Sequence, residues 1–161
     1  MSLLAVREAK SLRMFIVGDC PLQQLHSSVL LSRCGIQTIL ASDGLKAVLL
    51  AGKQHFDLIL MDIRMGVLNG VVATQRIRQN ERRVGTAEVP IVAHTAEPLA
   101  TNRAAWAAAG ITPSLAKPCK PAEMSECLKQ WCVVQLESQQ HCANEQTRPQ
   151  RAKCGSTQTK S

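Results

Sequence analysis

Four side chains that could act on a phosphoryl group each stand at the end of a short apolar run. They are the carboxylates Asp19 and Asp62, the hydroxyl of Thr95 and the ammonium of Lys117. Mg²⁺ typically binds one or two carboxylates and shares the phosphate oxygens of a substrate. A carboxylate can also be the nucleophile that forms an aspartyl-phosphate, and a hydroxyl with a lysine stabilises the charge on the transferred group. The set therefore indicates magnesium-assisted phosphoryl chemistry, provided that the fold brings the four side chains together.

The elements that would do so alternate regularly along the chain. Apolar runs predict strands over residues 14–17, 36–41, 56–61, 89–93 and 114–117. Helical spacing predicts helices from Pro21 to Cys34-Gly35 and over residues 45–51, 71–79, 99–109 and 122–136, with a polar, flexible stretch over 80–88. Five such alternations predict a doubly wound α/β fold with a five-stranded parallel sheet. The carboxyl ends of parallel strands share one edge, where all four side chains would then meet.

The two ends of the chain differ from this central part. Residues 1–13 read as a short leader, and residues 137–161 hold almost no large apolar residue, which predicts a disordered tail. One domain is therefore expected over residues 14–136. No apolar run is long enough for a signal peptide or a membrane span, so a cytoplasmic protein without membrane contact is expected.

Composition excludes other kinds of site. The net charge is +7, but the basic residues form no dense stripe with interleaved aromatics, so direct nucleic-acid binding is not expected. The seven cysteines include no C-x-x-C pair, which argues against a zinc site. Most of them lie in apolar stretches and read as small hydrophobic residues in a reducing compartment.

The same residues carry a family resemblance. The run from Met14 to Trp131 resembles the response-regulator receiver domain, especially receivers of hybrid sensor histidine kinases. The matching segments are FIVGDCP, ASDGLKAV, FDLILMDIRMGVLNG, VPIVAHTA, AAAGI and LAKPCKP, which occur in family order.

The resemblance implies a phosphorelay receiver, which is a signalling domain and not an enzyme. It implies Asp62 as phosphoacceptor, Thr95 as phosphoryl-binding hydroxyl and Lys117 as ion-pairing lysine. Magnesium would be held by Asp19, Asp62 and the backbone carbonyl of Arg64. The bond between Lys117 and the proline after it is usually cis in the family. The phosphoryl group would come from a histidine kinase or a histidine phosphotransfer protein, and a downstream protein partner would receive the signal.

Several positions depart from the family pattern. Gly18 replaces the first of two acidic residues, and Ser114 replaces an aromatic residue. Met65-Gly66 and Asn69-Gly70 stand where Met-Pro and Asp-Gly are usual. These changes support a second interpretation, a degenerate receiver that acts as a phosphorylation-independent interaction module.

The chemistry, the extent of the protein and the roles of single residues leave further interpretations open. A small α/β hydrolase or phosphatase with Asp62 as nucleophile would need a second carboxylate two residues later as general acid, and that position holds Arg64. The chain could be a stand-alone receiver or part of a hybrid kinase. Asp19 could cap the helix that follows it, Asp43-Gly44 reads as a turn, and His94 reads as a satisfied or exposed histidine.

Overall fold

The computed structural model describes residues 12–96 and 102–131. Its strands are β1 (Arg13–Val17), β2 (Gln37–Ala41), β3 (Leu58–Met61), β4 (Ile91–Thr95) and β5 (Thr112–Ala116). Its helices are α1 (Pro21–Ser32), α2 (Gly44–Ala51), α3 (Gly70–Val84), α4 (Arg103–Ala109) and a further helix over residues 121–131. The expected leader up to residue 11, the start of the fourth helix at 99–101, the residues after 131 and the tail lie outside the described residues.

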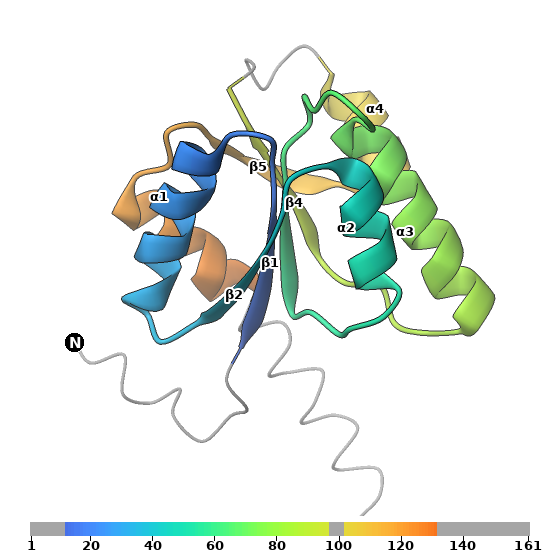
Figure 1. The fold of residues 1–161 in the computed structure, drawn as a ribbon, viewed down its shortest axis with the longest axis horizontal. Helices are drawn as coiled ribbons and strands as arrows, with labels where there is room; N and C mark the ends of the chain where they lie inside the picture. Colours follow the sequence, from blue (N-terminus) through green and yellow to red (C-terminus); the bar gives the residue numbers. More distant parts are fainter. Residues whose placement is uncertain (1–11, 97–101, 132–161) are drawn as a thin grey trace, which may run out of the picture.

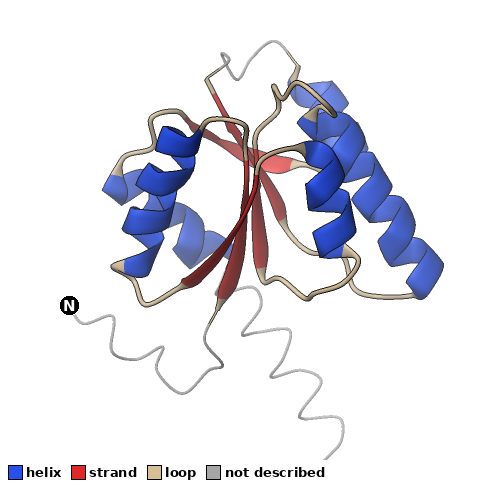
Figure 2. Ribbon diagram, viewed as in Figure 1, coloured by secondary structure: helices blue, strands red, loops and turns tan. Residues whose placement is uncertain are grey.

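The sheet is parallel and has the order β2-β1-β3-β4-β5. Helix α1 and the helix of residues 121–131 cover one face, and α2, α3 and α4 cover the other (Figures 1 and 2). This arrangement confirms the predicted doubly wound α/β fold. Because all the strand pairs are parallel, the carboxyl ends lie along one edge of the sheet, which is the upper end of β1 in Figure 1.

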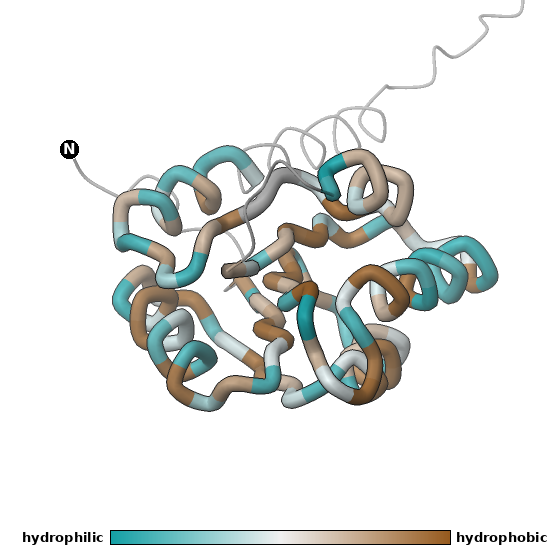
Figure 3. The backbone as a smooth tube through the Cα atoms, turned by 90° about the horizontal axis from the view of Figure 1, so that it is seen from above, coloured by the Kyte–Doolittle hydropathy of each residue, from teal (hydrophilic) through white to brown (hydrophobic). Residues whose placement is uncertain are grey.

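The core forms on both faces of the sheet because consecutive residues of the inner strands β1 and β3 are apolar and buried. All four residues of β3 are buried. Alternate residues of β1 and β3 point to opposite faces, which makes two apolar clusters. One includes Phe15, Ile59, Ile77 and Trp106, and the other includes Met14, Leu60, Leu115 and Met124. Seen from above, apolar residues concentrate along the central strands (Figure 3).

Helix α3 is longer than its sequence predicts. The stretch that begins at Asn80 was expected to be flexible, but the helix continues to Val84 and ends at Gly85, whose φ of 77° is the left-handed conformation that suits glycine. Arg78 is buried and its guanidinium contacts the carboxylate of Glu81 at 2.8 Å. The two residues lie one turn apart, and their ion pair stabilises the part of the helix that follows Ile77, where the polar composition had suggested a flexible stretch.

Strands β4 and β5 are displaced from their predicted bounds. β4 begins after Pro90 and includes His94 and Thr95, while β5 begins at Thr112 and ends before Lys117. Thr95 is therefore the last residue of a strand and not the start of a loop. The β4–β5 register shifts between Val92 and Ala93, an irregularity that apolar periodicity alone does not reveal.

Among the described helices, none combines the length and the apolar character needed to span a membrane.

Candidate functional site

Asp62 is the central residue of the site and directly follows β3. It is buried, and its N–H donates to the Val17 carbonyl at 2.9 Å, which extends the pairing of β3 with β1 by one residue. One carboxylate oxygen, Oδ1, accepts the Arg64 N–H at 3.0 Å. The backbone and this contact together fix the carboxylate at the upper edge of the sheet.

Lys117 lies opposite this carboxylate although 55 residues separate the two in sequence. Its Nζ donates to Asp62 Oδ2 at 2.5 Å, and both side chains are less than a tenth exposed. The Lys117 N–H donates to the Thr95 carbonyl at 3.0 Å, so β4 positions the lysine, and the Lys117-Pro118 bond is cis, as the resemblance implied. The structure therefore brings Asp62, Thr95 and Lys117 together at the ends of three adjacent strands.

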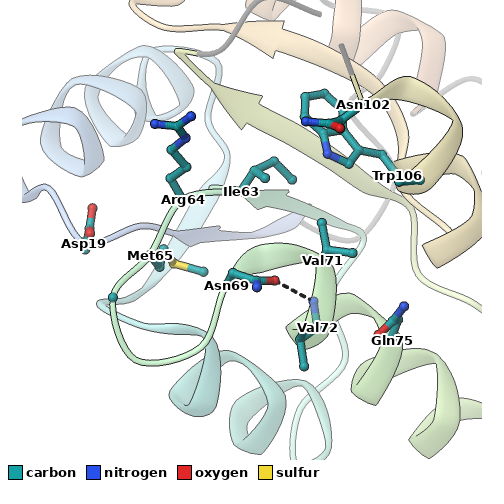
Figure 4. Close-up of a pocket in the computed structure, with 12 residues that line it drawn as sticks. Asp19, Ile63, Arg64, Met65, Asn69, Val71, Val72, Gln75, Asn102 and Trp106 are labelled. Atoms are coloured by element: carbon teal, nitrogen blue, oxygen red, sulfur yellow. Dashed lines mark hydrogen bonds between the residues drawn. The ribbon is translucent and has the colours of Figure 1, made fainter.

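Asp19 reaches the site from the loop after β1. Its side chain is exposed and lies across the loop that follows Asp62 (Figure 4). It does not cap α1, because the N-cap is Cys20 and no side-chain cap bond forms there. The side chain of Gln24, which the sequence did not single out, donates to the carbonyls of Gly18 and Ala41 at 2.8 and 2.7 Å and thereby fixes this loop.

The loop between β3 and α3 is held by a close approach that only glycine permits. A Cβ at Gly70 would lie 2.1 Å from the Asp62 carbonyl oxygen. The Gly70 N–H donates to the Ile63 carbonyl, and Asn69 caps α3 by accepting the Val72 N–H at 2.9 Å. The Asn69-Gly70 pair, which in the sequence is visible only as a departure from the family pattern, therefore positions the backbone around Asp62.

A cleft of about 700 Å³ runs from Asp19 and Arg64 past Asn69 to Asn102 and Trp106 (Figure 4). It connects the loop after β1 with the start of α3 and with α4. Asp62 is not among its lining residues, so the cleft is beside the carboxylate and does not contain it.

The oxygen ligands available suit a hard cation with few protein ligands. The two carboxylates predicted as ligands, Asp19 and Asp62, follow the adjacent strands β1 and β3, and within residues 12–96 and 102–131 no three His, Cys, Asp or Glu residues gather as a metal site. Mg²⁺ is commonly bound by one or two carboxylates with water in the other positions. The residues present therefore fit magnesium and lack the nitrogen and sulfur ligands that zinc prefers.

Gly18 borders the same carboxylate. A Cβ built there would lie 3.6 Å from Asp62 Cβ and 3.7 Å from Asp62 Oδ2, which are ordinary contact distances. The position has room for a side chain, so the absence of a second acidic residue next to Asp19 is a feature of the sequence that the backbone does not require.

His94 does not match its predicted environment. It was expected to be satisfied or exposed, but it is buried and its Nε2 has no hydrogen-bond partner among the described residues. Burial, with smaller contributions from the charges of Lys117 and His26, lowers the pKa of His94 to about 4. The imidazole is therefore neutral at physiological pH.

The parallel sheet, with a buried aspartate–lysine pair at its carboxyl edge, places the chain in the class of open α/β domains that bind ligands at that edge. Comparison with known proteins gives the family. The model of the response regulator receiver domain matches residues 14–129, and the chain belongs to that family. It is a receiver domain of the two-component phosphorelay type, and receiver domains are signalling domains.

The relatives come from larger proteins. The sensor protein GacS of Pseudomonas syringae pv. syringae is 29% identical over 126 residues, which are 78% of this chain and 14% of the relative. The chain therefore corresponds to a small part of that protein.

Two solved structures share the fold. The receiver domain of sensor histidine kinase PA1611 from Pseudomonas aeruginosa, with a magnesium ion in its active-site cleft, is 39% identical, with a TM-score of 0.66 and coverage of 76% of this chain and 98% of that one. A Saccharomyces cerevisiae response-regulator receiver, crystallised with a histidine phosphotransfer protein, is 28% identical, with a TM-score of 0.73 and coverage of 78% and 91%.

Proposed function

We propose that the chain accepts a phosphoryl group on Asp62 from a phosphohistidine. The observation that carries the proposal is the buried Asp62–Lys117 pair at the edge of the sheet, with Oδ2 and Nζ at 2.5 Å. A carboxylate oxygen forms the new bond to phosphorus while the bond from phosphorus to the donor's imidazole nitrogen breaks, and that nitrogen keeps the electron pair. The products are an acyl phosphate on Asp62 and a neutral histidine, whose ring takes up one proton from water as the bond to phosphorus breaks.

The residues around Asp62 would each have a role in this transfer. The Lys117 ammonium would neutralise charge on the transferred group, and the Thr95 hydroxyl would bind one of its oxygens. Asp19, Asp62 and the Arg64 carbonyl would hold magnesium, which would offset the negative charge of the phosphoryl oxygens. The protein's contribution is therefore mainly positioning and charge neutralisation.

The donor would be a histidine kinase or a histidine phosphotransfer protein. Support comes from the relatives, which include a hybrid signal transduction histidine kinase of Dictyostelium discoideum, and from the yeast receiver crystallised with such a transfer protein. A downstream protein partner would bind the phosphorylated form. Co-purification with wild type and with Asp62→Asn, each with and without acetyl-phosphate treatment, would identify it.

Labelling with acetyl phosphate, followed by intact-protein mass spectrometry across a magnesium titration, tests the proposal. Wild type should gain one phosphoryl group in a magnesium-dependent way, and Asp62→Asn should gain none because an amide is not a competent nucleophile. Asp43→Asn is the matched control, since Asp43 lies at the start of α2, where it accepts the Lys46 N–H and pairs with the Lys46 ammonium. Labelling that persists in Asp62→Asn would contradict the site. A wild type that neither acetyl phosphate nor a histidine donor labels would favour the phosphorylation-independent interaction module.

A further inference from the structure

The strand β2 forms an edge of the sheet, and its sequence lacks the features that usually protect such an edge. The order β2-β1-β3-β4-β5 leaves one side of β2 without a neighbouring strand among the described residues. Exposed edges are normally protected by charged residues, proline or bulges. The β2 sequence, QTILA, has no charge and no proline, and its pairing with β1 is regular.

The outward backbone groups of this edge can be assigned from the pairing with β1. The Gln37 N–H donates to the Leu12 carbonyl, and the Ala41 carbonyl accepts the Gly18 N–H, so the backbone groups of Gln37 and Ala41 face β1. Since strand backbone groups alternate, those of Thr38 and Leu40 face away from the sheet.

The surface on either side of this edge is unusually apolar. Of the eight large apolar side chains that the described residues expose, six lie on α1, β2 and α2: Leu22, Leu25, Val29, Leu40, Leu45 and Leu49. Both helices pack against β2, and in Figure 1 they flank it. Apolar patches of this kind on a folded domain mark interaction sites.

The surface is also nearly free of charge, although the chain carries +7. Helix α1 and strand β2 contain no Asp, Glu, Lys or Arg. The only such residue of α2 is Lys46, which pairs with Asp43 at 3.5 Å. Two copies of this surface could therefore meet without bringing like charges together.

We propose that two copies of the chain pair through antiparallel β2 strands, around a twofold axis that passes beside Ile39. In this register Thr38 of each copy exchanges both backbone hydrogen bonds with Leu40 of the other, which uses all four outward N–H and carbonyl groups. The axis is perpendicular to the sheet, so α1 of one copy lies beside α1 of the other. The exposed side chains of Leu22, Leu25 and Val29 on one α1 then pack against the same three side chains on the α1 of the other copy.

The uncharged edge and the uncharged α1 beside it favour a second copy as the occupant. With Ile39 at the centre, Thr38 and Leu40 of the two copies can pair in the symmetric register that a twofold interface requires. The Thr38 hydroxyl already pairs with the Ser28 hydroxyl at 2.8 Å, which holds the edge and α1 in one orientation. The paired sheets would form one continuous sheet of ten strands, five from each copy.

Sedimentation velocity of the full chain, from micromolar to several hundred micromolar, tests the pairing. Wild type should shift from monomer to dimer with concentration. Leu40→Lys and Leu25→Lys should each weaken the dimer about tenfold or more, because a charge must then be buried or the edge displaced. Val84→Lys, at an exposed apolar residue of α3, is the control and should leave the dimer unchanged. Thermal melting shows that each variant is folded.

Amide hydrogen exchange gives a residue-level readout. The Thr38 and Leu40 amides should exchange quickly in the dilute chain and slow down as the concentration rises, whereas the Ile39 amide should not respond. A wild type that stays monomeric throughout, or a dimer that Leu40→Lys and Leu25→Lys leave intact, would overturn the proposal. So would a monomeric wild type in which Leu25→Lys impairs transfer from a histidine donor, because the surface would then belong to a different partner.

Discussion

The domain contains two buried ion pairs that look alike and have different surroundings. Asp62 and Lys117 meet at 2.5 Å with side chains 8% and 6% exposed, and Arg78 and Glu81 meet at 2.8 Å with side chains 7% and 11% exposed. The first pair joins two loops at the carboxyl edge of the sheet. The second lies within α3, one helical turn apart.

The difference lies in what the remaining polar atoms contact. The Arg78 guanidinium also donates to the Gly110 carbonyl at 2.9 Å, and Glu81 accepts the Val89 N–H at 2.8 Å. This pair therefore connects α3 to the end of α4 and to the segment before β4. The Asp62–Lys117 pair instead adjoins the exposed Asp19 and the cleft beside Arg64. A buried ion pair indicates chemistry when an open, polar space adjoins it, and indicates structure when fixed backbone groups complete it.

Removing the charge of Arg78 should have the largest effect on stability. Arg78→Met leaves Glu81 buried without its cation and the Gly110 carbonyl without its donor, so unfolding should become easier by about 3–5 kcal/mol. Urea unfolding measures the change. Arg82→Met, four residues on and exposed, is the matched control and should change stability by less than about 0.5 kcal/mol. Equal midpoints for the two variants would show that the Arg78 pair is not structural.

Lys117→Met should impair phosphorylation strongly and stability only weakly, the reverse of what is expected for Arg78→Met. The loss of a charge aimed at the transferred group should slow phosphorylation by acetyl phosphate about a hundredfold. The stability loss should be smaller than for Arg78→Met, because water in the adjacent crevice can solvate the Asp62 carboxylate. Lys120→Met, at an exposed lysine nearby, controls for charge. A labelling rate equal to that of the control would remove Lys117 from the proposed site.

Lowering the pH should destabilise the folded chain through His94, the buried residue that precedes Thr95 on β4. The pKa of His94 is about 4 in the folded chain and 6.5 when unfolded. Between these values the unfolded state binds more protons, so stability falls as the pH drops from about 6.5 to 4, by at most about 3 kcal/mol. Lys117 and His26, whose positive charges also disfavour the imidazolium, remain in place.

The difference between wild type and His94→Leu isolates this effect from the carboxylates that titrate in the same range. Urea unfolding at pH 7 and pH 4 should show a larger loss for wild type than for the variant. Parallel losses in the two proteins would show that the folded chain does not hold His94 as a buried neutral ring.

The sequence predicted the sheet well because its signals are local. The continuous apolar run before Asp62 and the Pro21 start of α1 fix strands and helices without tertiary information. The convergence of Asp19, Asp62, Thr95 and Lys117 follows from the topology of a parallel sheet, so the placement of the site could also be predicted.

The features that the sequence did not reveal depend on contacts between distant residues. No local pattern marks Arg78 as buried, because the carbonyl that its guanidinium contacts, at Gly110, lies 32 residues away. His94 looked ordinary because its burial depends on two helices that cover one face of the sheet. Gly70 looked like a loop glycine, and only the 2.1 Å distance from a Cβ at that position to the Asp62 carbonyl shows why a larger residue is excluded.

The smallest expected effect concerns position 18, where the site around Asp62 has a glycine instead of a second acidic residue next to Asp19. Gly18→Asp places a third carboxylate near Asp62, in space that the backbone leaves open. At a separation near 4 Å in a water-like dielectric, one added negative charge attracts the divalent cation by about 2 kcal/mol, so magnesium should bind about thirtyfold more tightly. The same charge should destabilise the metal-free protein by a similar amount, because three carboxylates then repel one another.

Gly18→Asn is the matched control, with nearly the same size and no charge. Calorimetric titration with magnesium should show tighter binding for Gly18→Asp only, and thermal melting without metal should show the loss for Gly18→Asp only. In saturating magnesium the two variants should melt alike, since the bound cation offsets the repulsion. If Gly18→Asn tightened magnesium binding equally, the gain would come from an added oxygen ligand and not from charge. The Asp62–Lys117 pair would then differ from the Arg78–Glu81 pair mainly because the space beside it can hold further oxygen ligands for a metal ion, and less because of the charges around it.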